Sequence, residues 1–246
     1  MYTTAYALVD YFNVARLPGH RPATYADHAD ALEELVGLLL GAATALQPRP
    51  GFLKIRLYGG WHDERTNRTT DAREMLGAIA RRHYPTLRPL RVFVSLADSL
   101  IALPRYELRH TLRLWNGIGR PRTRRHGACA YPDTCPLGDL REWARGSCPK
   151  RPDCSVKTRE AVLTERQKLV DTSMVADTMH LARHTSTDWI AVVSNDDDIL
   201  PGLLAAAADN QQLLLYTVER SQPSQYGPLL DHLEVKYQPL SRSYTR

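Results

Sequence analysis

Residues Trp189–Asp198 have the sequence WIAVVSNDDD, a short apolar run that ends in polar and acidic residues. Because Trp189 to Ser194 is rich in β-branched and aromatic residues, the run predicts a buried strand. A second strand is predicted at Thr4–Val9, and Asp10 follows it directly. Acidic residues therefore come soon after the end of each of these two predicted strands.

The segments around these two strands alternate between strand and helix patterns. Further strands are predicted at residues 52–58, 91–96 and 213–218, and helices at residues 24–46, 70–83, 170–182 and 200–208. Thr24 and Asp27 suit the N-terminal turn of the first helix. Strands separated by helices favour parallel pairing with right-handed crossovers. The sequence thus predicts an α/β fold, a three-layer sandwich around a central, mainly parallel sheet, built by a single domain over residues 1–246.

Composition limits the class of protein. The chain has 246 residues, 43% hydrophobic and 24% charged, which excludes a natively disordered chain. A net charge of +5 allows an anionic partner without requiring one. No apolar run approaches the ~20 residues that span a bilayer, and the N-terminus lacks the features of a secretion signal. We therefore expect a cytoplasmic protein that does not associate with membranes.

The acids that follow the two strands suggest a metal site. Ligands of open parallel sheets bind at the carboxyl ends of the strands, where the strand order reverses. If the two strands are neighbours, Asp10 and residues 196–198 share one crevice, where the carboxylates cannot all stay ionised without a cation. Mg²⁺ or Mn²⁺ would suit such oxygen ligands and would serve phosphoryl chemistry. Two plainer roles stay open: Asp10 as a turn former or helix cap, and the acidic run as a solvated loop.

A third group of polar residues precedes the strand at Trp189. Lys168, Asp171 and Asp177 lie at the start of the predicted helix 170–182. The two acids are six residues apart, about 240° around a helix, so both face one site only if Asp171 precedes the helix proper. This spacing favours Asp177 as the helix-borne metal ligand.

Three motifs occur in a fixed order along the chain. They are Asp10 with Asn13; Lys168, Val170, Asp171 and Asp177; and Ser194, Asn195, Asp196 and Asp198. The set resembles the NYN family of the PIN-like ribonuclease superfamily, in particular its bacterial branch with one short nuclease domain. The match covers roughly residues 4–60, 88–97 and 160–235. The chain departs from the family at Gly59 and Gly60, where an acid often follows the second strand, and at Asn195, where the family has a smaller residue.

The resemblance implies a PIN-like, Rossmannoid fold and a metal-dependent endoribonuclease that hydrolyses RNA phosphodiester bonds. The catalytic residues that it implies are Asp10, Asp171, Asp177, Asp196 and Asp198. Of these, Asp10, Asp177 and Asp196 would hold Mg²⁺ or Mn²⁺, with Asp171 and Asp198 acting directly or through water. Asn13 would orient the substrate or a carboxylate. We also expect Lys168, Ser194 and Asn195 to contact the substrate.

Residues 99–160 do not follow the alternation of strands and helices, which predicts a small inserted module. Arg105 to His126 carries seven arginines and one acid, Glu107. After Pro104 the spacing predicts an amphipathic helix with a stripe of arginines, although a simply solvated helix face would show the same pattern. Arginines of this kind bind phosphate backbones. The expected RNA contacts are Arg105, Arg109, Arg113, Arg122, Arg124 and Arg125.

The same insertion contains all four cysteines of the chain. Cys129, Cys135, Cys148 and Cys154 are spaced C-x5-C-x12-C-x5-C. Two close pairs suit a tetrahedral zinc ion, which would stabilise a segment that has no core of its own. Free thiols and disulfides are the alternatives, because the gaps are wider than in most zinc sites.

Two other classes of function fit less well. A catalytically silent PIN-like module could bind RNA or a protein through the arginines, but it would have no need for five mutually repelling acids. A phosphatase that forms a phosphoaspartate would need an acid where Phe12 stands, and a toprim enzyme would need Glu in its first motif. The sequence leaves homodimer formation open. From Ser221 onward, three prolines predict a tail that wraps the surface and frays at its end.

Overall fold

The computed structural model divides the chain into two units. It describes residues 3–15, 21–83, 90–116, 136–145, 148, 150–151, 153–156, 162–184, 189–209, 212–218 and 226–240. The first unit comprises Met1–Thr111 and Gln167–Arg246, and the second comprises Leu112–Arg166. Within the described ranges, no helix has both the length and the apolar character needed to cross a membrane.

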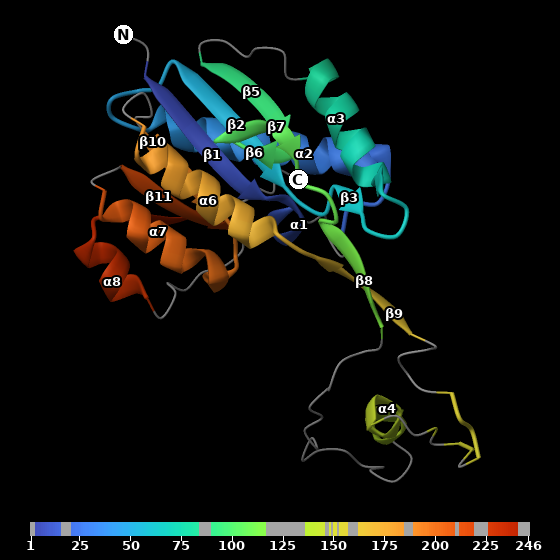
Figure 1. Cartoon of the computed structure of the whole chain (residues 1–246). Helices are drawn as coiled ribbons and strands as arrows, with labels where there is room; N and C mark the ends of the chain where they lie inside the picture. Colours follow the sequence, from blue (N-terminus) through green and yellow to red (C-terminus); the bar gives the residue numbers. More distant parts are fainter. Residues whose placement is uncertain are drawn as a thin grey trace, which may run out of the picture. The chain divides into compact units, whose positions relative to one another are not determined.

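A six-stranded sheet forms the centre of the first unit (Figure 1). Its strands, in spatial order, are β12 (Lys236–Leu240), β11 (Leu213–Val218), β10 (Trp189–Val193), β1 (Thr4–Asp10), β2 (Phe52–Tyr58) and β5 (Arg91–Leu96). Every neighbouring pair is parallel. The chain runs outward from β1 to β5 and then returns to β10 on the other side of β1. The predicted α/β class and all five predicted strands are confirmed, and the strand order reverses between β1 and β10.

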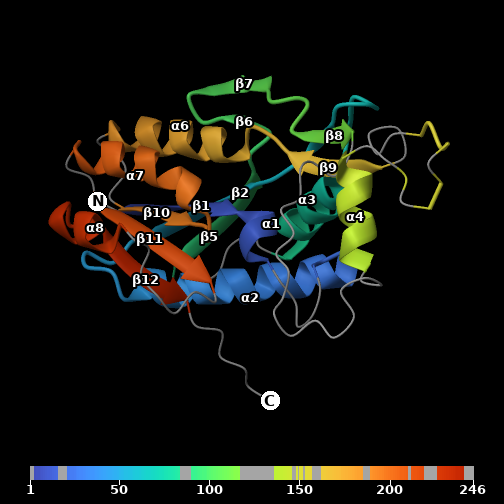
Figure 2. The same cartoon turned by 90° about the horizontal axis from the view of Figure 1, so that it is seen from below.

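Helices cover both faces of this sheet, as Figure 2 shows. They are α2 (Tyr25–Thr44) and α3 (Asp71–His83) on one face, and α6 (Val170–Ala182), α7 (Leu200–Ala207) and α8 (Gly227–His232) on the other. Leu32 and Ile79 belong to the core on the first face. Met174, Leu203 and Leu230 belong to the core on the second face. The arrangement is compatible with the predicted three-layer sandwich.

The start of α2 shows how local sequence sets an element boundary. The Thr24 hydroxyl accepts a hydrogen bond from the Asp27 N–H at 3.2 Å, and the Asp27 carboxylate accepts one from the Thr24 N–H at 3.0 Å. This reciprocal pair is a capping box, which satisfies two backbone donors that the helix itself leaves unpaired. The predicted N-terminal turn is therefore confirmed.

The predicted arginine-striped helix after Pro104 is wrong. Ser99–Leu100 (β6) and Leu103–Glu107 (β7) instead form an antiparallel hairpin, and Leu112–Asn116 forms β8. His110, between β7 and β8, has a φ of 59°. A right-handed helix cannot pass through that left-handed conformation. The segment also contains Tyr106, Thr111 and Trp115, residue types that favour strands over helices.

The tail from Ser221 is more structured than predicted. Residues 227–232 form α8, and residues 236–240 form β12, which extends the sheet as an edge strand. Leu230 and Val235 are buried against the second-face core. Pro228 lies in the first turn of α8, where no intrahelical N–H is required, and Pro239 lies on the edge strand, where its missing N–H is tolerated. The last residues, 241–246, lie outside the described ranges.

Several short elements complete the first unit. They are α1 (Tyr11–Val14), the antiparallel pair β3 (His62–Asp63) and β4 (Arg68–Thr69), and the 3₁₀ helix η1 (Asp197–Ile199). Of these, α1 directly follows β1, and η1 lies between β10 and α7. Both therefore lie next to the point where the strand order reverses.

The second unit contains β8, α4 (Pro136–Arg145) and most of β9 (Leu163–Gln167). β8 and β9 are neighbours in one sheet, and the Arg166 guanidinium carbon lies 5.0 Å from the centroid of the Trp115 ring. The predicted insertion, residues 99–160, overlaps this unit, but residues 99–111 belong to the first unit.

Candidate metal site

The reversal of strand order brings the two acidic motifs to one edge of the sheet. β1 and β10 are parallel neighbours with Val9 opposite Val193. Asp10, the last residue of β1, and Ser194, the residue after β10, therefore lie at the same edge of the sheet. This is the position where open parallel sheets bind their ligands. A shared crevice was expected if the two strands are neighbours, and β1 and β10 are neighbours.

Asp10 is a buried carboxylate at this position, with 5% of its surface exposed. Its pKa is raised from 3.8 to about 7, mainly by burial and also by the charges of Asp171 and Asp196, although hydrogen bonds from Asn13 lower it in part. The Ser194 hydroxyl donates to Asp10 Oδ2 at 3.5 Å. Without a cation, Asp10 thus exchanges its proton near neutral pH and not near pH 4, because its surroundings disfavour the charged form.

Three further carboxylates lie close together beside Asp10. Asp171, Asp196 and Asp198 each offer an oxygen atom, and these atoms all lie within 4.8 Å of one another. The pKa of Asp171 is raised by partial burial and by the charges of Asp196 and Asp198. The three residues and Asp10 therefore repel one another, and a divalent cation among them would remove that repulsion.

The elements that carry these acids explain how they meet. Asp171 lies in the first turn of α6. Asp196 precedes η1, where its carboxylate accepts a hydrogen bond from the Asp198 N–H at 3.1 Å. α6 packs against both η1 and β1. Asp196 thus caps a short helix and also joins the acidic group.

The structure does not place Asp177 in this group. Asp177 is fully buried on α6, and both carboxylate oxygens are engaged. Oδ2 accepts hydrogen bonds from Tyr58 Oη at 2.5 Å and Arg56 Nε at 3.2 Å, and Oδ1 accepts one from the Ile101 N–H at 2.7 Å. Since α6 begins at Val170, Asp171 and Asp177 both lie within the helix. They are about 240° apart around its axis, so Asp177 faces away from the acidic group that contains Asp171. The geometry thus favours Asp171, not Asp177, as the helix-borne ligand.

Asn13 and Asn195, predicted to contact substrate, bond to each other. The Asn195 N–H donates to Asn13 Oδ1 at 3.2 Å, and the Asn195 amide donates to the Asn13 carbonyl at 3.4 Å. Asn195 Oδ1 also accepts from the Val218 N–H at 2.9 Å. The Ser194 hydroxyl accepts from the Asp196 N–H at 3.0 Å. These contacts join the ends of β1, β10 and β11, so they position the acids.

The predicted basic residues lie in different parts of the chain. Lys168 is exposed just before α6. Arg105 and Arg109 are exposed in and after β7, in the first unit. Arg113 lies in β8, in the second unit. Arg122, Arg124 and Arg125 lie outside the described residues.

The buried partners of Asp177 were missed from the sequence. Arg56 and Tyr58 lie on β2 beside the centre of the sheet. The sequence contained one indication of these partners. Arg56 is a charged residue between apolar residues of a predicted strand, and such a charge requires a partner when it is buried.

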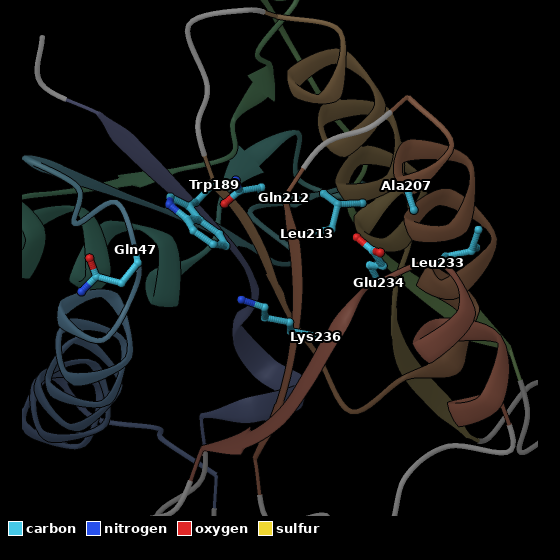
Figure 3. Close-up of a pocket in the computed structure, with 8 residues that line it drawn as sticks. All are labelled: Gln47, Trp189, Ala207, Gln212, Leu213, Leu233, Glu234 and Lys236. Carbon is cyan, nitrogen blue, oxygen red and sulfur yellow. The ribbon is translucent and has the colours of Figure 1, made fainter.

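A pocket of about 350 Å³ lies at the opposite end of the sheet (Figure 3). Trp189, Leu213 and Lys236 line it, and each is the first residue of its strand. The Lys236 ammonium lies 5.3 Å from the centroid of the Trp189 ring. Because Asp10 and Asp196 lie at the carboxyl ends of β1 and β10, this pocket is separate from the acidic group.

Fold and site together define an α/β protein with an acidic group where the strand order of a parallel sheet reverses. Comparisons of the chain with protein-family models, curated proteins and solved structures gave no match.

Proposed function

We propose that this protein is a metal-dependent endoribonuclease that hydrolyses RNA phosphodiester bonds at the acidic group. The observation that carries the proposal is the convergence of Asp171, Asp196 and Asp198 beside the buried Asp10. The choice of RNA as substrate rests on the resemblance of the three motifs to the NYN branch of the PIN-like ribonucleases.

The donor set fits a hard divalent cation. Carboxylate oxygens are the ligands that Mg²⁺ and Mn²⁺ take, usually together with several waters. Asp171, Asp196 and Asp198 would hold the ion, and Asp10 would lose its proton as the ion compensates its charge. The bound ion would supply a water of lowered pKa and compensate charge on the phosphoryl oxygens.

The other residues of the site serve to hold these acids in place. Ser194 lies between Asp10 and Asp196, and its hydroxyl contacts both. Asn195 links Asn13 with the end of β11. A preorganised set of this kind lowers the reorganisation needed when charge develops in a transition state.

Cleavage of labelled RNA and DNA by the wild-type protein in Mg²⁺, Mn²⁺ or EDTA tests the proposal. Asp171→Asn and Asp196→Asn should each abolish metal-dependent RNA cleavage and weaken Mn²⁺ binding measured by calorimetry. Asp30→Asn is the matched control, because Asp30 is exposed on α2, on the other face of the sheet. RNA binding without cleavage in every metal would overturn the proposal and favour the silent binding module.

We also propose that the four cysteines hold a structural zinc ion. Cys129 and Cys135 lie outside the described residues, whereas Cys148 and Cys154 are unpaired by disulfide and half-buried. Hydrogen bonds from the backbone N–H groups of Lys150 and Arg151, and one with the Cys154 side chain, lower the pKa of the Cys148 thiol. A lowered pKa favours the thiolate, which is the form that binds zinc.

Elemental analysis tests the zinc proposal. The wild-type protein should contain one zinc per chain after purification in metal-free buffer. Cys148→Ser and Cys154→Ser should both lose it. A wild-type protein without zinc, or serine variants that retain it, would contradict the proposal.

A further inference from the structure

The β6–β7 hairpin, Ser99–Glu107, carries two large apolar side chains that are exposed to solvent. Every residue of β7 is exposed. Tyr106 is 71% exposed and Leu103 is 51% exposed. Exposed apolar side chains on a folded element often mark a binding surface.

The hairpin is held both at its turn, by Ile101, and at its base, by Asp98, despite this exposure. The Ile101 N–H donates to the buried Asp177 carboxylate at 2.7 Å, and Arg56 donates to the Ser99 carbonyl. The Asp98 carbonyl accepts from the Leu108 N–H at 2.6 Å. The Asp98 carboxylate forms two hydrogen bonds with Arg73 of α3, at 3.2 and 2.8 Å. An exposed element with a fixed base presents its side chains in a defined geometry.

The hydrogen bond between Ile101 and Asp177 places the hairpin against α6, the helix that also carries Asp171. Asp177, which holds Ile101, lies on α6 six residues after Asp171. At 1.5 Å per residue, this separation is about 9 Å along the helix axis. α6 packs against β6 as well as against η1, and Figure 2 shows β6 and β7 beside α6. The hairpin therefore lies close to the helix that carries Asp171.

The side chains of the hairpin match the chemistry of a single nucleic-acid strand. Arg105 directly precedes Tyr106 in the sequence, Arg109 follows just after the hairpin, and both arginines are exposed. The carboxylate of Glu107, the residue after Tyr106, lies 3.5 Å from the Arg109 guanidinium. Proteins that bind single strands combine arginines that contact phosphates with aromatic rings that stack on bases. A duplex would offer its phosphates but not its base faces.

We infer that the β6–β7 hairpin binds the single-stranded part of the RNA substrate. Tyr106 stacks on an unpaired base, and Arg105 and Arg109 contact the neighbouring phosphates. The inference deepens the proposed function and depends on it for the identity of the nucleic acid. A protein partner or a second copy of this chain is the competing occupant of the same surface.

Fluorescence anisotropy in EDTA measures RNA binding separately from cleavage. Tyr106→Ala should weaken binding of a labelled single-stranded RNA about 5- to 150-fold, whereas Tyr106→Phe should retain most of the affinity. Binding of a fully paired RNA should change little in both variants. Tyr25→Ala is the matched control, because Tyr25 is an exposed tyrosine at the start of α2, away from the hairpin.

The salt dependence of RNA affinity tests whether Arg105 and Arg109 contact phosphates. Arg105→Ala and Arg109→Ala should each reduce the slope of log affinity against log salt concentration by about 0.7, the value for one phosphate contact on a single strand. Circular dichroism would verify that each variant is folded.

Three outcomes would overturn the inference. The first is wild-type affinity of Tyr106→Ala for single-stranded RNA, and the second is an equal loss with paired RNA. The third is wild-type self-association, measured by sedimentation, that Tyr106→Ala abolishes without changing RNA binding. Failure of the proposed function would be seen in the cleavage assay and not in the binding assay. RNA would then stay uncut in every metal, whether or not the variants change RNA affinity.

Discussion

The Tyr58 hydroxyl donates a 2.5 Å hydrogen bond to Oδ2 of Asp177, and both side chains are almost completely buried. Burial and the charge of Asp177 raise the pKa of Tyr58 well above 10, so the phenol remains a donor. Arg56 supplies the compensating charge, 3.2 Å from the same oxygen. These three side chains join β2 to α6, the helix that carries Asp171.

Removing this carboxylate should destabilise the fold strongly. Asp177→Ala leaves Arg56 largely buried and without its charged partner, a change that typically costs about 3–5 kcal/mol. Tyr58→Phe removes one hydrogen bond from a buried carboxylate and should cost about 1–3 kcal/mol. Urea unfolding, monitored by circular dichroism, measures both changes in the free energy of unfolding.

Mn²⁺ binding by the folded variants shows whether Asp177 has a structural role or is a metal ligand. Tyr58→Phe and Asp177→Asn, examined where they remain folded, should bind Mn²⁺ with an affinity close to that of the wild type, in contrast to Asp171→Asn. A stable Asp177→Asn protein that has lost Mn²⁺ binding would instead assign Asp177 to the metal.

Most of the sheet could be predicted from the sequence because its strands are short apolar runs flanked by helices with clear periodicity. Residues 52–58, 91–96 and 213–218 form strands with the predicted bounds. The segment after Pro104 was mispredicted because arginines at a four-residue spacing suit a helix face and also an exposed hairpin. A pattern of charges alone does not distinguish the two.

The acidic group was predictable only in part. Asp10 and Asp196 follow strands whose adjacency the α/β order suggested, and that adjacency is present. The choice between Asp171 and Asp177 depended on where α6 begins, and helix boundaries are poorly specified by sequence. Arg56 and Tyr58 are distant from Asp177 in the chain, so their ion pair and hydrogen bond arise from tertiary packing.

The buried Asp10 should make the metal-free protein less stable as pH rises. Its folded pKa of about 7 exceeds the ordinary value of 3.8. The folded state therefore favours the protonated form, and this contribution is complete below pH 4 and is lost as pH rises through 7. The full difference corresponds to roughly 4 kcal/mol. Urea unfolding in EDTA between pH 4 and pH 8 measures it.

Asp10→Asn provides the control for this pH dependence. The amide carries no charge, so the variant should be more stable than the wild type at pH 8 in EDTA, with a shallower pH dependence. The wild type should regain stability at pH 8 when Mn²⁺ is added. Parallel pH profiles for the two proteins would show that Asp10 is not the group responsible.

Asn195 should matter more for the position of the acids than for substrate contact. Asn195→Ala removes the acceptor of the Val218 N–H and the donor to the Asn13 carbonyl. We expect a loss of about 1–3 kcal/mol in the free energy of unfolding and weaker Mn²⁺ binding, because Asp196 is the next residue. A variant with wild-type stability and metal affinity but weaker RNA binding would support the original prediction that Asn195 contacts substrate.

We expect the close approach of α6 and α7 to set the distance between Asp171 and the acids that precede α7. A Cβ atom placed on Gly202 of α7 would lie 2.5 Å from Cγ1 and 2.9 Å from Cβ of Val175 on α6. Gly202→Ala should therefore push the helices apart, cost about 1–3 kcal/mol of stability and weaken Mn²⁺ binding. Calorimetry and urea unfolding measure the two effects.

A second substitution shows whether the contact itself is responsible. Val175→Ala removes both Cγ atoms while its Cβ remains, so Gly202→Ala with Val175→Ala should recover part of the lost stability and metal affinity. The change at Val175 alone should have a small effect, because its side chain is only partly buried. If the double variant loses the sum of the two single losses, the helices do not meet at this pair, and their packing does not control the spacing of the acids.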